Sequence, residues 1–371
     1  MEKVRIGIIG CGRISKNHVN GIAKNSDTAA LVSTCDLIEE KASRRAKDYE
    51  SMVDSKVTVY TDYRKMLDEE ILDLVVVATE SGYHARISID VLKSGRHVIV
   101  EKPMALSIDD ANEMIAEAKR AKKILIVSHQ NRFNKAIQTT RAALEDGRFG
   151  RLFSGAAVIR WNRNYSYYNM APWRGTWAMD GGALMNQCIH NIDLLRWMMG
   201  DGIDEVFAYT ANMNHPYVEG EDIGTALIRF SNGSFGTIEG NVNVFPKNLE
   251  ETLSIFGEKG TVVIGGIAVN KILTWRFADG SDDKEKILKE HIEDPPNVYG
   301  FGHVALYKDA IESIKDEKKP YVDGEAGKKA VELVLAIYKS SREHKPVKLP
   351  LSHFSTLDMK DQKDKDNFLS V

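Results

Sequence analysis

Short apolar runs alternate with amphipathic stretches over the first third of the chain. Apolar runs of this length predict buried strands, and the stretches between them have the spacing of helices that bury one face. The predicted strands span residues 4–10, 30–35, 57–60, 72–78, 97–100 and 124–127. The predicted helices between them include residues 64–67, 84–94 and 107–122. Strands that alternate with helices predict βαβ units and a parallel, doubly wound sheet of the Rossmann type.

Beyond a helix predicted over residues 135–145, strands follow one another with hairpin-like turns. They are predicted at residues 152–161, 205–213, 224–230, 235–241, 251–256, 261–264 and 272–275. Asn232-Gly233 lies between two of them and predicts a tight hairpin turn. Helices are expected at residues 182–199, within this strand-rich region, and at 304–315 and 325–343, where they close the second half. This pattern predicts an α+β domain with a large, mostly antiparallel open sheet.

These two patterns divide the chain. We expect an α/β Rossmann domain over residues 1–128 and an α+β domain over residues 129–350. From residue 351 the chain is polar and charged, so we expect residues 351–371 to form a loosely held tail.

The composition mainly excludes classes of partner and location. A net charge of −3 gives no basic surface for nucleic acid or for an anionic membrane. No segment approaches the roughly 20 apolar residues that span a bilayer, and the first residues lack the pattern of a signal peptide. Cys11, Cys35 and Cys188 stand singly without metal-type spacing, which indicates reduced thiols. We expect a cytoplasmic protein with no metal site.

A glycine-rich turn follows the first predicted strand and opens the first helix. Gly10 allows a tight turn, and Gly12 allows the backbone to approach a pyrophosphate at the helix N-terminus. Ser15 occupies the third position of this fingerprint and is still small. Asp36 follows the second strand, where the ribose-binding acid is expected, and would repel a 2′-phosphate. The turn therefore predicts NAD and makes NADP less favourable, with a Rossmann-like fold that binds no nucleotide as the alternative.

Other residues near the ends of the predicted strands are expected to line the cofactor. These are Arg13, Ile14, Thr79, His84, Glu101, Lys102 and Gln130. For His84, contact with the nicotinamide or ribose competes with a role in capping the following helix.

The strand at residues 97–100 ends in Glu101-Lys102-Pro103. Ligands of open parallel sheets bind beyond the carboxyl ends of the strands, so Lys102 is placed to reach one. Glu101 could orient the lysine, and Pro103 stiffens the turn. An oxidised nicotinamide nearby would disfavour the charged ammonium and make Lys102 a better proton acceptor. The alternative is a surface lysine in a βα loop.

The helix expected at residues 182–199 carries three polar side chains on one face. Asn186, His190 and Asp193 are spaced by four and then three residues. A substrate with several hydroxyl groups could partner them, although a core His190 satisfied by Asp193 is an almost equal alternative. Oxidising an alcohol requires a hydride acceptor and a proton acceptor. A nicotinamide together with Lys102 and His190 would supply both, so these two residues are the predicted catalytic pair.

The glycine turn, the Glu101-Lys102-Pro103 strand end, the run from Gln130 to Phe133 and the helix with His190 together resemble the Gfo/Idh/MocA family up to about residue 350. The resemblance implies NAD(P)-dependent oxidation or reduction of a sugar or cyclitol by a homodimer or homotetramer built through the open sheet. It matches Lys102 to the family's catalytic lysine and His190 to its usual acid/base. Inositol dehydrogenases of the family carry an aspartate where this chain has Asn186, whose amide cannot relay a proton.

The segments 173–177 and 180–187 are most similar to the subset of the family that oxidises nucleotide-linked amino sugars, the UDP-N-acetylglucosaminuronate 3-dehydrogenases. This resemblance implies oxidation at C3. Arginine forks suit a diphosphate and a sugar carboxylate, and an aromatic ring suits a uracil. The expected substrate-binding residues are Lys102, Arg132, Arg163, Trp173, Arg174, Asn186, His190 and Asp193. Arg160, Tyr165, Tyr167 and Tyr168 are expected nearby, unless Arg160 and Arg163 merely decorate a strand and the tyrosines belong to a mobile loop.

Three other functions remain open from the sequence. One is an inositol or free-sugar dehydrogenase, and another is a glycosidase that retains NAD and oxidises C3 transiently. The third is a non-catalytic NAD-binding regulator, which the presence of both Lys102 and His190 disfavours.

Overall fold

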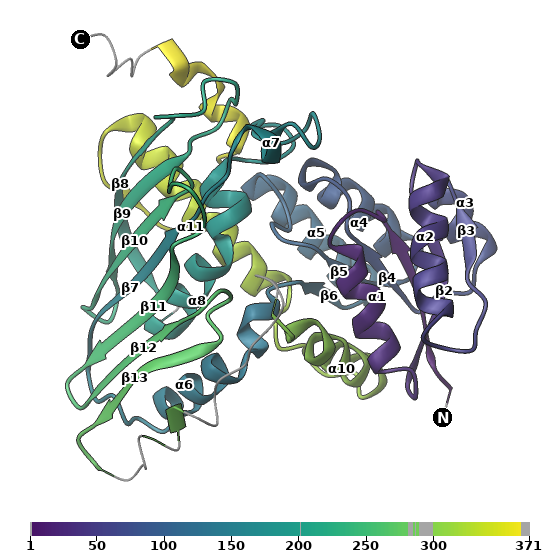
Figure 1. Cartoon of the computed structure of the whole chain (residues 1–371), viewed down its shortest axis with the longest axis horizontal. Coiled ribbons are helices and arrows are strands. Elements are labelled where there is room, and N and C mark those ends of the chain that lie inside the picture. Colours follow the sequence, from purple (N-terminus) through teal and green to yellow (C-terminus); the bar gives the residue numbers. More distant parts are fainter. Residues whose placement is uncertain (1, 201, 281–284, 286, 289–299, 365–371) are drawn as a thin grey trace. The chain divides into compact units, whose positions relative to one another are not determined.

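The computed structural model describes residues 2–200, 202–280, 285, 287–288 and 300–364. The chain divides into two compact units, drawn together in Figure 1. The first unit comprises Met1–Ala105, Asp109–Gln130 and Phe301–Lys328. The second comprises Leu106–Ile108, Asn131–Gly300 and Lys329–Val371.

A six-stranded parallel sheet forms the centre of the first unit, as the apolar runs predict. Its strands are β1 (Val4–Ile9), β2 (Ala29–Cys35), β3 (Thr58–Tyr60), β4 (Leu74–Val77), β5 (His97–Val100) and β6 (Leu125–Val127). They lie in the order β3-β2-β1-β4-β5-β6. The order reverses between β1 and β4, which is where a doubly wound sheet binds its ligand. Every residue of β4 is buried, as expected for a strand covered on both faces.

Helices connect and cover these strands. They are α1 (Ser15–Lys24), α2 (Glu39–Glu50), α3 (Tyr63–Glu69), η1 (Ser81–Tyr83), α4 (His84–Lys93), α5 (Ile108–Ala121) and η2 (Gln130–Phe133). A further helix, α10 (Gly302–Lys315), joins them from far along the chain. The prediction that this helix closes the second half was wrong. It packs on α1, where Asn25 Nδ2 donates to the Val304 carbonyl at 3.1 Å.

Gly21 explains how α10 comes so close to α1. A Cβ at this position would stand 2.5 Å from a ring carbon of Tyr307, so the tyrosine ring of α10 fits only against a glycine. Amphipathic spacing shows that a helix buries one face, but it does not show which sheet that face covers.

An eight-stranded sheet forms the second unit and is mostly antiparallel, as predicted. Its strands are β7 (Leu152–Arg160), β8 (Ile203–Ala211), β9 (Ile223–Phe230), β10 (Phe235–Asn241), β11 (Glu250–Gly257), β12 (Gly260–Gly265), β13 (Lys271–Phe277) and β14 (Val347–Lys348). Their order is β13-β12-β11-β7-β10-β9-β8-β14, and β10 pairs with β7 in parallel. The predicted hairpin joins β9 to β10, with Gly233 at a φ of 84°.

Helices lie against one face of this sheet. The helical elements are α6 (Lys135–Glu145), α7 (Tyr165–Tyr168), η3 (Leu184–Cys188), α8 (Ile189–Met199), α11 (Gly324–Glu343) and η4 (Thr356–Asp364). Figure 1 shows α8 and α11 on the same side of the strands. On the other side, alternate strand positions expose large apolar side chains, among them Tyr209, Leu227, Phe235 and Phe256.

The segment after residue 350 is held to the second unit as far as the structure describes it, so the expectation of a loose tail was wrong there. Phe354 accepts a backbone hydrogen bond from Ile108 at 3.0 Å, and Thr356 donates through its hydroxyl to the Trp177 carbonyl at 2.6 Å. Met359 is buried. Isolated apolar residues anchor this polar segment; residues 365–371 lie outside the described part. Among the described residues, no helix combines the length and apolar character needed to cross a membrane.

Candidate active site

The glycine-rich turn lies against the ends of two neighbouring strands of the first unit. Gly10 has a φ of 92°, and a Cβ there would stand 2.5 Å from the Ala78 carbonyl at the end of β4. Its N–H donates to the Cys35 carbonyl at the end of β2 at 2.8 Å. Gly12, two residues further on, has open space for 4 Å around its Cβ position. The turn therefore leaves room for a pyrophosphate at the start of α1, which fits a dinucleotide.

Asp36 is held at the end of β2 by the same turn. Its carboxylate accepts the N–H of Cys11 at 2.8 Å and that of Ile38 at 2.9 Å. Burial, together with the charge of Asp36, raises the pKa of the Cys11 thiol to about 12, so this cysteine stays protonated. Backbone atoms thus orient the carboxylate expected to bind a ribose, and the following Leu37 is an exposed apolar residue that offers no cation to a 2′-phosphate.

The other expected cofactor residues are spread over the same unit. Arg13 is exposed, Ile14 and Thr79 are half-buried, and Gln130 is buried. His84 is also buried, and its ring contacts two carbonyl oxygens: Nδ1 lies 2.7 Å from that of Pro103 and Nε2 lies 3.1 Å from that of Thr79. The described contacts of this ring therefore link two loops and include no capping bond to the α4 backbone.

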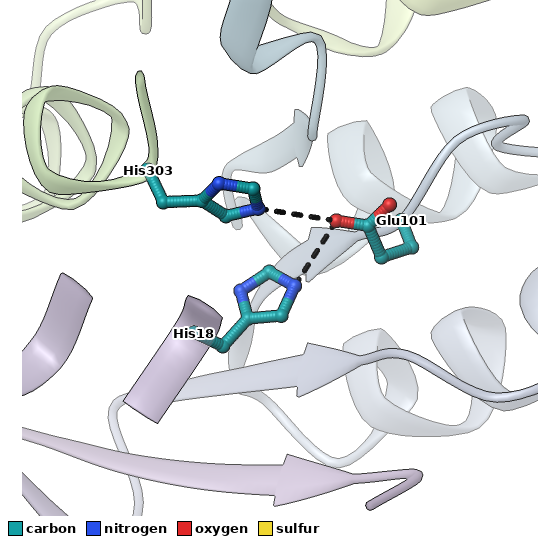
Figure 2. Close-up of side chains that lie close together, drawn as sticks. All are labelled: His18, Glu101 and His303. Carbon is teal, nitrogen blue, oxygen red and sulfur yellow. Dashed lines mark hydrogen bonds and ion pairs between the residues drawn. The ribbon is translucent and has the colours of Figure 1, made fainter. Parts of the chain in front are cut away.

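Lys102 is half-buried directly after β5, and its N–H donates to Glu101 Oε2 at 3.2 Å. Figure 2 shows the other oxygen of Glu101 facing two imidazoles, His18 from α1 and His303 from α10. Sequence reasoning missed both histidines because their partner is distant in the chain. The available signal was weak: His18 lies one turn into the helix that the glycine turn opens.

In the second unit the expected helix at 182–199 begins differently. Residues Leu184–Cys188 form a π-helical turn, and the regular helix α8 starts at Ile189. Asn186 lies in the π-helical turn and donates to Asp180, whose other oxygen accepts the Gly175 N–H at 2.7 Å. Insertions of this kind re-aim side chains and are frequent at functional sites. Asn186 and His190 therefore do not follow the ideal α-helical spacing from which the shared face was inferred.

Asp193 is buried and held by arginines. Arg132 binds it with two hydrogen bonds of 2.7 and 2.6 Å, and Arg196 Nη2 lies 3.3 Å from the same carboxylate. The Arg132 guanidinium also lies over the Trp197 ring at 4.7 Å. His190, three residues before Asp193 on α8, is 9% exposed. Because arginines bind the Asp193 carboxylate, we assign Arg132 and Asp193 to the support of α8, and their direct contact with a substrate stays a prediction.

Arg163 and Arg174 lie against the ring of Tyr167, at 4.9 and 4.4 Å from its centroid. Arg174 also stacks on Trp173 at 4.7 Å. The Tyr167 hydroxyl accepts from Arg174 Nη1 at 2.5 Å and from Gln187 Nε2 at 2.9 Å. This arginine–tyrosine cluster thus joins α7 to the π-helical turn.

Arg160 is bound elsewhere, by Glu239 of β10 and Glu250 of β11. These partners agree with the interpretation of Arg160 as a residue that decorates a strand. Tyr168 is buried, with its ring centroid 5.3 Å from that of His215.

Two buried pairs that sequence reasoning did not single out support these segments. His215 Nδ1 lies 2.9 Å from Asp222, and its Nε2 lies 2.6 Å from the Arg163 carbonyl. Glu221 accepts the Leu184 N–H at 2.7 Å and the Tyr338 hydroxyl at 2.8 Å. Burial raises the pKa of Glu221 to about 8, so it is mostly protonated at pH 7. No local motif marks Glu221, whose partners lie 37 and 117 positions away, whereas His215 and Asp222 are only seven residues apart.

The predicted residues divide between the units. Lys102 and all predicted cofactor residues belong to the first unit, whereas His190 and the remaining predicted substrate residues belong to the second.

Comparison with known proteins identifies the fold and the cofactor. Residues 4–129 match an oxidoreductase family model described as an NAD-binding Rossmann fold, and residues 141–349 match the model of the C-terminal alpha/beta domain of the same family. The structure is similar to that of the WlbA dehydrogenase from Bordetella pertussis in complex with NADH and UDP-GlcNAcA, with 40% identity, 95% of this chain and 99% of that chain covered, and a TM-score of 0.87.

A second WlbA structure, from Chromobactrium violaceum and also in complex with NADH and UDP-GlcNAcA, is 38% identical, covers 95% of this chain and 97% of that one, and has a TM-score of 0.85. The myo-inositol 2-dehydrogenase of Thermotoga maritima is 28% identical over 357 residues, which cover 93% of this chain and 98% of the relative. The chain therefore belongs to the Gfo/Idh/MocA family and is an NAD-dependent oxidoreductase that acts on CH–OH groups.

Proposed function

We propose that this protein oxidises the C3 hydroxyl of a nucleotide-linked sugar acid, with UDP-N-acetylglucosaminuronate as the first candidate. The observation that carries the proposal is the arginine–tyrosine cluster. Among the described residues, Arg163 and Arg174 form hydrogen bonds only through Nη1. A guanidinium has five N–H donors, so donors remain for phosphate or carboxylate oxygens. The 40% identity with a dehydrogenase crystallised with UDP-GlcNAcA supports the same substrate class.

Lys102 and His190 are the proposed proton-handling residues. A bound NAD would accept the hydride from the carbon, while one of the two side chains takes the hydroxyl proton. Asn186, held by Asp180, can bind a hydroxyl but cannot pass a proton on. For this reason we assign the proton transfer to Lys102 and His190 without a carboxylate relay at position 186.

Gly10, Gly12 and Asp36 would hold the dinucleotide, with Arg13, Ile14, Thr79, Glu101 and Gln130 as further lining. Lys102, Arg163, Trp173, Arg174, Asn186 and His190 would bind the sugar nucleotide, with Arg132 and Asp193 behind them.

Two further properties belong to this proposal. The exposed apolar positions of the eight-stranded sheet suit a homodimer or homotetramer, because a face with Leu227 and Phe235 exposed gains by burial. The three cysteines are buried free thiols, which supports a reducing compartment such as the cytoplasm.

The test is a substrate panel followed at the NADH absorbance. It compares UDP-N-acetylglucosaminuronate, UDP-N-acetylglucosamine, glucuronate and myo-inositol, each with and without a 2-oxo acid to re-oxidise the cofactor. We expect kcat/KM to be at least about tenfold higher for UDP-N-acetylglucosaminuronate than for glucuronate or myo-inositol. Preference for myo-inositol or a free sugar would replace the proposal with that dehydrogenase, and release of sugar from a nitrophenyl glycoside without net NADH would replace it with a glycosidase.

A further inference from the structure

The segment Glu101-Lys102-Pro103 is contacted by buried imidazoles on both sides of the lysine. His18 Nε2 lies 3.0 Å from Glu101 Oε1, and His303 Nε2 lies 3.8 Å from the same oxygen (Figure 2). On the other side of Lys102, His84 Nδ1 lies 2.7 Å from the Pro103 carbonyl. All three rings belong to the first unit, and each is at least 97% buried. Three residues from three other segments thus meet one short loop.

The hydrogen bonds form a chain with a defined direction. A carboxylate only accepts, so the Nε2–H of His18 donates to Glu101. The remaining nitrogen of His18, Nδ1, lies 2.9 Å from the Tyr307 hydroxyl, which can donate to it. Glu101 Oε2 in turn accepts the N–H of Lys102 at 3.2 Å. The chain therefore runs from α10 through α1 to the backbone of the lysine itself.

The charge of Glu101 is essential to this chain. Burial by itself would raise the pKa of Glu101, but the hydrogen bond from His18 and the nearby His303 imidazole hold that pKa well below its usual range. Burial lowers the pKa of His84, and the shorter of the two carbonyl contacts of its ring, 2.7 Å from Nδ1, is to Pro103. A charged hydrogen bond in a dry interior is stronger than its equivalent in water, so the loop is held firmly.

We propose that His18, His84 and His303 are positioning residues that set Lys102 for proton transfer through Glu101 and Pro103. This inference rests on the proposed role of Lys102. Holding a proton acceptor within a fraction of an ångström of its working position contributes to turnover, and small displacements are costly. The three histidines would act on kcat while leaving the glycine turn and Asp36, and with them the binding of the dinucleotide, intact.

His18, Glu101 and His303 also form a donor set of the kind that binds zinc, with ligand atoms within 4.8 Å of one another. Tetrahedral zinc with bonds of about 2.0–2.2 Å would place neighbouring ligand atoms about 3.3 Å apart. The contacts of Glu101 Oε1 are unequal instead, 3.0 Å to His18 and 3.8 Å to His303. The shorter one is a hydrogen-bond length, so the geometry favours the hydrogen-bonded chain.

The test compares two substitutions at each of two positions. His303→Leu and His84→Leu remove the polar contacts, whereas His303→Gln and His84→Gln keep an N–H donor. We expect kcat to fall at least about tenfold in each leucine variant, with the KM for NAD within about threefold of the parent protein. Each glutamine variant should recover most of the lost kcat. His353→Gln, at an exposed position, is the matched control and should leave both constants unchanged.

Other results would contradict either the positioning role or the proposed function. Unchanged kcat in both leucine variants, alongside a large loss in Lys102→Ala, would overturn the positioning role and leave the proposed function standing. Full activity in Lys102→Ala alone would remove the lysine from proton transfer and with it the role on which this inference rests, whereas full activity in both Lys102→Ala and His190→Asn would overturn the proposed function itself. A leucine variant that unfolds is replaced by its glutamine partner, in which a loss of kcat as large as that of Lys102→Ala would also contradict the proposal. One equivalent of zinc in the purified protein, lost in His303→Gln, would show a metal site instead.

Discussion

In the first unit backbone atoms hold the glycine turn and Asp36, whereas in the second unit other side chains hold the predicted substrate residues Asn186 and Asp193. Gly10 and Asp36 are set by N–H and C=O groups at the ends of strands. Asn186 and Asp193 depend on Asp180 and Arg132, whose side chains come from other segments. A backbone-built site tolerates a change of side chain without loss of fold. A site built from paired side chains couples each residue's function to stability, because removing one partner leaves the other buried and unsatisfied.

The largest effect on kcat is expected from removing the proposed proton acceptors, one of which lies in each unit. Lys102→Ala in the first unit and His190→Asn in the second should each lower kcat about 10²- to 10⁴-fold, the usual contribution of a positioned proton acceptor. NADH binding, measured by fluorescence titration, should be unchanged in both. If only one substitution has this effect, a single unit supplies the proton acceptor and the proposed sharing of the chemistry is wrong.

Asp193→Asn tests whether paired side chains stabilise the second unit. The substitution leaves Arg132 and Arg196 buried beside a neutral amide, and breaking a buried ion pair typically costs about 3–5 kcal/mol. We expect a large fall in the urea midpoint of the transition that reports on this unit. Asp204→Asn, which breaks an exposed pair with Arg229, is the control and should change stability by less than about 1 kcal/mol. Equal effects of the two substitutions would contradict the comparison.

Glu221 should make the stability of the second unit depend on pH. Its pKa is about 8 in the folded protein and about 4.3 in an unfolded chain, so between these values the folded state binds more protons than the unfolded state. Stability therefore falls as pH rises through this window, and below about pH 4.3 the effect vanishes.

Urea midpoints at pH 5 and pH 8 measure this effect. The free energy of unfolding of the parent protein should fall between pH 5 and pH 8. In Glu221→Gln we expect this fall to be smaller by about 2–4 kcal/mol. Burial also raises the pKa of Glu251 to about 8, which adds a slope of the same sign and makes Glu251→Gln a useful companion. Equal pH dependence in the parent protein and in Glu221→Gln would show that Glu221 is ionised when folded.

The smallest effect is expected at Asp36, where backbone atoms hold the side chain. Asp36→Asn keeps an oxygen that can accept the Cys11 N–H but removes the charge that binds a ribose and repels a 2′-phosphate. We expect the KM for NAD to rise about tenfold, activity with NADP to increase, and the free energy of unfolding to stay within about 1 kcal/mol of the parent. Asp27→Asn, at an exposed position, is the control. Unfolding of Asp36→Asn would show that the first unit also depends on this side chain.

Much of the fold could be predicted because its signals are local. Apolar runs separated by amphipathic stretches identified all six strands of the parallel sheet within a few residues, and Asn232-Gly233 identified a hairpin. Gly10, Gly12 and Asp36 could be found for the same reason, since a turn between a strand and a helix has a fixed spacing. Lys102 and His190 were chosen as catalytic on pattern and resemblance, and that choice awaits the substitutions above.

The sequence by itself determined the strands, the glycine turn and the two classes of sheet, because each depends on periodicity or on backbone geometry within a few residues. Only the tertiary structure decided that α10 belongs to the first unit, that Asp193 is bound by Arg132, and that His18 and His303 meet at Glu101. These contacts join residues between about 60 and 290 positions apart, where the three-dimensional path of the chain and the need to satisfy buried charges select the partner.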